Sequence, residues 1–189
     1  ATAFNAVKAS IDAQLPADAM FKDDTGKTVR LGDYFGERPV VLAFVYYECP
    51  MLCNQILNGL VSSIGVLDET AGKDFDVVAI SFDARETPTQ AAAKKATYLD
   101  RYQRPGSERG WHFLTGDEAT IKRVTDTAGF QFAWDAATQQ FAHASGIIVT
   151  TPEGKLSRYL FGIEYPPRDL KFALMESSAG KIGSVVDQV

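Results

Sequence analysis

The chain has little of several features that mark common classes of protein. Its 189 residues include only two cysteines and two histidines, and two thiols are too few for a framework of disulfides. No apolar run approaches the ~20 residues of a membrane-spanning helix. Acidic and basic residues are interspersed with a net charge of −5, so no basic stripe predicts a nucleic-acid partner.

Signals for targeting are also missing from the sequence. No charged segment is followed by the apolar stretch of a signal peptide. Because the chain starts at Ala1 and stops abruptly at Val189, we interpret it as a trimmed or processed piece of a longer protein, from which a leader or membrane tether could have been removed. With 46% hydrophobic residues, we expect one core and a single domain over residues 1–189.

Hydrophobic periodicity predicts strands that alternate with helices. The expected strands are 39–47, 75–82, 111–114, 145–151 and 156–162, with a hairpin over 20–31. The expected helices are 4–14, 54–67, 88–102, one carrying Ile121, Val124 and Ala128, and 168–177. Thr115 and Glu118 have the spacing of a capping box for the fourth of these helices. The alternation predicts an α/β fold with a central mixed sheet flanked by helices.

Both cysteines lie in the motif Cys49-Pro50-Met51-Leu52-Cys53, between the strand at 39–47 and the helix at 54–67. At a spacing of i and i+4 they share one helix face, within reach of one metal ion or of each other. Pro50 suits the first helical position, which places Cys49 at the helix N-terminus. The helix dipole favours a thiolate there, whereas the neighbouring carboxylate of Glu48 opposes it.

The pair has a structural and a functional interpretation. A disulfide closing so short a loop contributes only about 2 kcal/mol in the chain-entropy model, so a functional pair is favoured over a staple or inert buried cysteines. Two thiolates form a soft site suited to Cu(I) and less selectively to zinc. The thioether of Met51 is also soft, although a methionine more often packs than ligates.

Either histidine is a candidate third ligand. His112 lies inside the short strand at 111–114 and is interpreted as structural. His143 comes just before the buried run at 146–149. Since chemistry in such sheets gathers at one edge, and a loop before an antiparallel strand reaches the edge where the cysteines lie, His143 is the hypothetical third member of a Cys-Cys-His site.

Several segments together resemble the Sco/SenC family. They are 27–36, 46–53, 79–83 followed by Thr87-Pro88, and His143 followed by 151–154. The resemblance spans about 20–163, so the expected thioredoxin-like domain has its core there, with an N-terminal hairpin and a C-terminal helical extension over 164–189. This chain has Met51 and Ala142 where family members commonly have acidic residues.

The resemblance also implies a function. Family members bind copper, as Cu(I) or Cu(II), through two cysteines and a histidine, which correspond to Cys49, Cys53 and His143. They are exported to the periplasm or the outer face of the cytoplasmic membrane. They help assemble the dinuclear copper centre of cytochrome c oxidase by delivering copper, by reducing thiols, or both. The implied partners are the copper-site subunit of that oxidase or another cuproprotein, and a thiol reductant.

Two enzymatic alternatives use the same cysteines. In a thiol-disulfide oxidoreductase, Cys49 would attack and Cys53 would resolve the mixed disulfide. Such enzymes normally carry C-x-x-C and a proline beside the site, whereas this chain has C-x-x-x-C and no proline over 142–146. A peroxiredoxin-like peroxidase needs a threonine in the motif where this chain has Glu48, which disfavours that reading.

Overall fold

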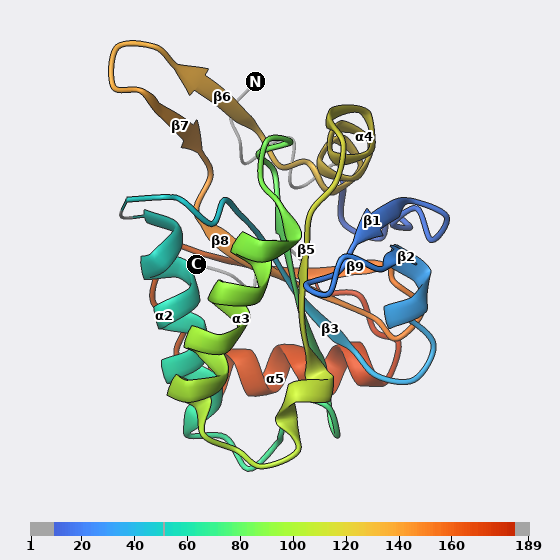
Figure 1. Cartoon of the computed structure of the whole chain (residues 1–189). Helices are drawn as coiled ribbons and strands as arrows, with labels where there is room; N and C mark the ends of the chain where they lie inside the picture. The colour runs from blue at the N-terminus through green and yellow to red at the C-terminus, as the bar shows by residue number, and fades with distance from the viewer. Residues whose placement is uncertain (1–9, 51, 184–189) are drawn as a thin grey trace.

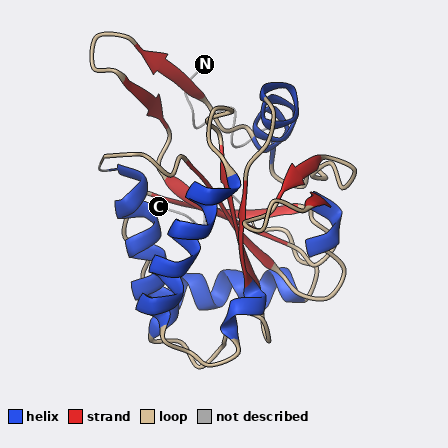
Figure 2. Ribbon diagram, viewed as in Figure 1, coloured by secondary structure: helices blue, strands red, loops and turns tan. Residues whose placement is uncertain are grey.

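A five-stranded mixed sheet forms the centre of the molecule, in the order β5-β4-β3-β8-β9 (Figures 1 and 2). The structure is a computed structural model and describes residues 10–50 and 52–183. The strands are β3 (Val40–Val45), β4 (Asp76–Ser81), β5 (Trp111–Leu114), β8 (Gly146–Thr150) and β9 (Leu156–Phe161). The first three are parallel, β8 is antiparallel to β3, and β9 is antiparallel to β8. The predicted mixed sheet is therefore confirmed.

The central strands owe their place to continuous apolar sequence. Every residue of β3 and β4 is buried, as expected for parallel strands covered on both faces. Helix α2 (Leu52–Gly65) packs against α3 (Pro88–Tyr102) and against α5 (Pro167–Ser178). Helix α4 (Glu118–Ala128) follows β5. The described residues also include two short 3-10 helices, η1 (Leu31–Tyr34) and η2 (Ser107–Gly110).

Two small antiparallel hairpins lie outside the central sheet. Strands β1 (Met20–Lys22) and β2 (Thr28–Arg30) form the predicted N-terminal hairpin, in whose turn Gly26 has a φ of 85°. Strands β6 (Phe132–Asp135) and β7 (Gln140–His143) form a second hairpin, which projects from the body of the molecule in Figure 1. The sequence analysis missed this second hairpin and treated the residues before β8 as a loop.

Two local predictions need correction. Residues 4–9 of the helix predicted over 4–14 lie outside the described residues, and the chain has left helical geometry by Asp12, where φ is 71°. The cap of α4 is Asp117, whose side chain accepts from the Thr120 N–H at 2.7 Å, while the backbone of Thr115 pairs with Lys22. The predicted capping box is therefore wrong, because a carboxylate nearer the first turn takes its place.

The helix after the cysteines starts close to its predicted position. Pro50 lies in a bend before α2 rather than in its first turn, and Met51 lies outside the described residues. Across residues 10–50 and 52–183, no helix is both long and apolar enough to cross a membrane.

Candidate metal centre

Cys49, Cys53 and His143 come together, with one ligand atom of each lying within 4.8 Å of the others. Cys49 follows β3, Cys53 lies in the first turn of α2, and His143 ends β7. Because β8 runs antiparallel to β3, the start of β8 and the end of β3 share one edge of the sheet. The structure thus brings together the three residues that the sequence singled out.

The backbone around Cys49 directs a hydrogen-bond donor at its sulfur. The N–H of Cys53 donates to the Sγ of Cys49 at 3.3 Å, and the N–H of Cys49 donates to the carbonyl of Tyr46 at 3.2 Å. Both cysteines are free and buried. The first turn of α2 therefore presents a backbone donor to Cys49, as expected for a thiolate at a helix N-terminus.

The two thiols have opposite shifts in acidity. The hydrogen bond from the Cys53 thiol lowers the pKa of Cys49, and contacts with His143, the Cys53 N–H and Tyr46 act in the same direction against the effect of burial. The pKa of Cys53 is raised because its proton is held by Cys49 and because the group is buried. The pair thus shares one proton between a Cys49 thiolate and a Cys53 thiol.

His143 is held with one ring nitrogen toward the thiols. Its Nε2 lies 3.3 Å from the Sγ of Cys53, and its Nδ1 lies 2.8 Å from the carbonyl oxygen of Ala144. A carbonyl only accepts, so Nδ1 carries a hydrogen and Nε2 is the ring nitrogen available to a metal ion. Such a bond to the second nitrogen is the usual support of a metal-ligating histidine.

Aromatic rings enclose the histidine. Phe82 lies 5.1 Å from the His143 ring, and Tyr46 and Phe130 lie about 6 Å from it (6.1 and 6.2 Å). Tyr46 also hydrogen-bonds to Cys49. The sequence analysis did not assign Tyr46 a role, although a tyrosine three residues before a reactive cysteine is a visible signal.

The other histidine lies elsewhere, as expected for a structural residue. His112 is on β5, with Nε2 3.2 Å from an oxygen of Asp76 and its ring 4.3 Å from that of Tyr34. Asp76 begins β4 and also accepts from Arg38 at 3.2 Å. His112 and Asp76 therefore lie toward the starts of the parallel strands, whereas Cys49 lies beyond their ends.

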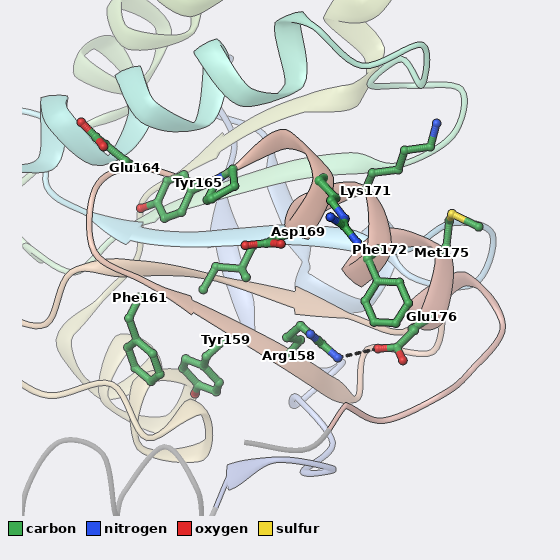
Figure 3. A pocket seen from close by; sticks show the side chains of 13 residues that line it. Arg158, Tyr159, Phe161, Glu164, Tyr165, Asp169, Lys171, Phe172, Met175 and Glu176 are labelled. Carbon is green, nitrogen blue, oxygen red and sulfur yellow. Dashed lines mark hydrogen bonds and ion pairs between the residues drawn. The ribbon is translucent and has the colours of Figure 1, made fainter. Parts of the chain in front are cut away.

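A cavity of about 930 Å³ lies between β9 and α5, away from the three candidate ligands (Figure 3). Its wall includes the ion pair of Arg158 with Glu176, at 2.7 Å, and the half-exposed ring of Phe172. None of the cysteines or His143 lines it. The cluster is instead a compact site of two sulfurs and one imidazole nitrogen, a donor set that suits a soft ion such as Cu(I).

A thioredoxin-like α/β sheet with two thiols at the junction of β3 and α2, and an imidazole from β7 beside them, defines a class of small domains that handle metals or thiols. The sequence model of the SCO1/SenC family matches residues 11–174. The chain belongs to the SCO1/SenC family.

Solved structures agree with this fold. A putative electron transfer protein from Aquifex aeolicus shares 24% identity at a TM-score of 0.79, over 90% of this chain and 95% of that one. Arabidopsis thaliana ScoI with copper bound shares 22% identity at a TM-score of 0.67, over 85% and 96% of the two chains. BsSco, described with a disulfide switch, shares 21% identity at a TM-score of 0.68, over 90% and 97%. No curated protein matches the sequence.

Proposed function

We propose that this protein is a copper-binding metallochaperone that holds copper through Cys49, Cys53 and His143 and serves assembly of the dinuclear copper centre of cytochrome c oxidase. The observation that carries the proposal is the convergence of three soft or borderline donors within 4.8 Å. Family membership supports it, as does the plant relative that was crystallised with copper bound. BsSco is a member of the Sco family of cytochrome c oxidase assembly proteins.

The donor set suits a cargo that must leave again. Cys49 offers a thiolate, Cys53 gives up its proton when copper arrives, and Nε2 of His143 supplies a neutral ligand. Three protein donors leave room for a ligand of the recipient to enter. The recipient in this proposal is the copper-site subunit of the oxidase or another cuproprotein, and a thiol reductant keeps the cysteines in the dithiol form that binds copper.

We place this activity outside the cytoplasm, in the periplasm or at the outer face of the cytoplasmic membrane. A cysteine pair that alternates between disulfide and dithiol suits an oxidising compartment, and the family resemblance implies export. Fractionation of cells that express the full-length natural protein tests this placement, and recovery in the cytoplasmic fraction would exclude it.

The central experiment is a Cu(I) titration of the anaerobically reduced protein against a competing chelator. We expect one tightly held ion per chain, and a marked loss of affinity in Cys49→Ser and in Cys53→Ser. Failure of the unaltered protein to compete with the chelator would refute the proposal.

The asymmetry of the two thiols favours a second candidate, a thiol-disulfide oxidoreductase. The Cys49 thiolate would attack a partner disulfide and release one partner thiolate. Cys53 would then lose its proton and attack the Sγ of Cys49, which releases the fully reduced partner and leaves the Cys49–Cys53 disulfide. A thiol reductant restores the pair. Reduction of protein disulfides no faster than by a small dithiol would exclude this activity.

A further inference from the structure

The two halves of the cluster come from separate parts of the fold. The cysteines lie where β3 passes into α2, whereas His143 lies on the β6–β7 hairpin, which is not part of the central sheet. The chain between β4 and α3 touches both halves. We call residues 82–86 the linking segment.

Glu86 joins the linking segment to the cysteine half. Its buried carboxylate accepts the backbone N–H of Tyr47 at 2.6 Å and that of Glu48 at 2.8 Å, one on each oxygen. The hydroxyl of Ser81 donates to the same carboxylate at 2.5 Å. The two amides come after β3 has ended and immediately precede Cys49, so Glu86 supplies the acceptors that a neighbouring strand would otherwise provide.

Arg85 joins the linking segment to the histidine half. Its guanidinium lies 5.2 Å from the ring centre of Trp134 and 6.0 Å from that of Phe141, both on the hairpin. Two bonds of 2.9 Å to the carboxylate of Asp83 fix the guanidinium in that position. The register pairs Trp134 with Phe141, so this one largely exposed cation contacts both strands of the hairpin.

Phe82 completes the connection. Its ring lies 5.1 Å from that of His143 and 5.3 Å from those of Tyr46 and Phe141. Rings at these separations make favourable edge and offset contacts. One short segment therefore contacts the backbone before Cys49, the hairpin, and the ring of His143 itself.

We propose that the linking segment sets the geometry of the copper site, with Glu86 positioning Cys49 and Arg85 positioning His143. The inference rests on the proposed copper-binding function. A merely structural role predicts something different, namely a loss of stability with no change in the bound copper.

The test compares Glu86→Gln and Arg85→Ala with Asp76→Asn in the full chain. Glutamine has the shape of glutamate but only one acceptor oxygen, so one of the two clamped amides loses its partner. Asp76 is a matched control, since it is a buried carboxylate at the far end of β4 that accepts from Arg38 and His112. Cu(I) affinity, the sulfur-to-Cu(II) absorption band and the thermal midpoint are measured for each variant.

We expect Glu86→Gln to weaken Cu(I) binding about tenfold, the scale of losses when support around a metal ligand is removed, and to shift the absorption band. Arg85→Ala should weaken binding in the unaltered background but not in His143→Ala, because its effect passes through the histidine. Glu86→Gln should act in both backgrounds. Asp76→Asn should lower the thermal midpoint and leave the Cu(I) affinity and the absorption band unchanged.

An unchanged affinity and absorption band in Glu86→Gln would overturn the role of Glu86. An equal effect of Arg85→Ala with and without His143 would overturn the role of Arg85. Hydrogen exchange of the Tyr47 and Glu48 amides in the copper-free protein separates this inference from the proposed function. If the unaltered protein binds no copper, the proposed function fails. If the Tyr47 and Glu48 amides exchange at the same rate in Glu86→Gln as in the unaltered protein, the positioning of Cys49 by Glu86 is refuted, whatever the copper result.

Discussion

The Nε2 of His143 lies 3.3 Å from the Sγ of Cys53, although 90 residues separate them in the chain. The antiparallel pairing of β8 with β3 accounts for the encounter, because it returns the chain to the edge where β3 ends. Closing so long a loop costs conformational entropy, which burial of the aromatic cluster around His143 helps to offset. Completion of the site therefore depends on the fold as a whole and not on the cysteine motif alone.

This relationship predicts different results for the two histidines. His143→Ala should weaken Cu(I) binding by about tenfold or more, since removal of a ligand should cost at least as much as loss of the groups that support one. His112→Ala is the matched control, because His112 contacts Asp76 and Tyr34 and not the cysteines. Chelator competition measures the Cu(I) affinity of both variants. An equal loss of affinity in His143→Ala and His112→Ala would contradict a Cys-Cys-His site.

The shared proton of the cysteine pair predicts how copper affinity depends on pH. The pKa of Cys49 lies below its ordinary value and that of Cys53 above it, so the copper-free pair carries one proton over the range between them. Binding releases that proton from Cys53, and the apparent affinity for Cu(I) should rise about tenfold per pH unit between roughly pH 7 and 8.

Titration at several pH values measures this slope, and calorimetry in buffers of different ionisation enthalpy counts the released protons directly. In Cys53→Ser the thiol that holds the proton is gone, so the slope should flatten. Release of two protons per ion by the unaltered chain would show that both thiols are protonated before copper arrives, contrary to the geometry of the Cys53 N–H at Cys49.

Much of the site was predictable because its signals are local. An apolar run ending at a cysteine, a second cysteine four residues on and a helical pattern after it place both thiols at a strand–helix junction. Topology made His143 a candidate, since a strand that returns antiparallel brings its preceding residues to the same edge, and the family resemblance strengthened that prediction. The bounds of α3 and β5 coincide with their prediction because their patterns are long or strongly apolar.

The hairpin and the linking segment were not predictable in the same way. Strands β6 and β7 are largely exposed or half-buried, so their apolar alternation is weak, and their connection lacks the Asn-Gly or Asp-Gly signal of a tight turn. The contacts of Glu86 with the backbone before Cys49 join residues 38 and 39 positions apart. Nothing in the spacing of a single sequence reports which distant amides a buried carboxylate will accept.

Close packing of α2 against the residue just before the C-terminal extension, Ile163, predicts a sensitive glycine. A Cβ added at Gly59 would lie 1.9 Å from the carbonyl oxygen of Ile163, so Gly59→Ala must displace backbone and should destabilise the fold by about 1–3 kcal/mol or more. Gly65 is the control in the same helix, with no atom within 4 Å of an added Cβ, and Gly65→Ala should be neutral or slightly stabilising.

Denaturant unfolding of the two glycine variants measures the difference. Because Gly59 lies six residues beyond Cys53 in α2, copper binding to folded Gly59→Ala also reports whether the chain around Ile163 influences the site. Equal stabilities of the two variants would show that the chain around Ile163 moves aside without cost, contrary to the contact described.

The cap of α4 gives a prediction with a defined dependence on pH. The Thr120 N–H donates to the carboxylate of Asp117 and lowers the pKa of that carboxyl below its ordinary value. A carboxyl whose folded pKa is depressed stabilises the fold above its unfolded pKa, and this contribution disappears as the pH falls through the folded value. Asp117→Ala should therefore lower the thermal midpoint at neutral pH, and its deficit should shrink in acid.

Glu118→Ala is the control, since Glu118 makes no side-chain hydrogen bond within the described part of the chain. Thermal unfolding of both variants is measured from neutral to acidic pH. A larger, pH-dependent loss of thermal midpoint in Glu118→Ala than in Asp117→Ala would favour the capping box that the sequence predicts over the Asp117 cap.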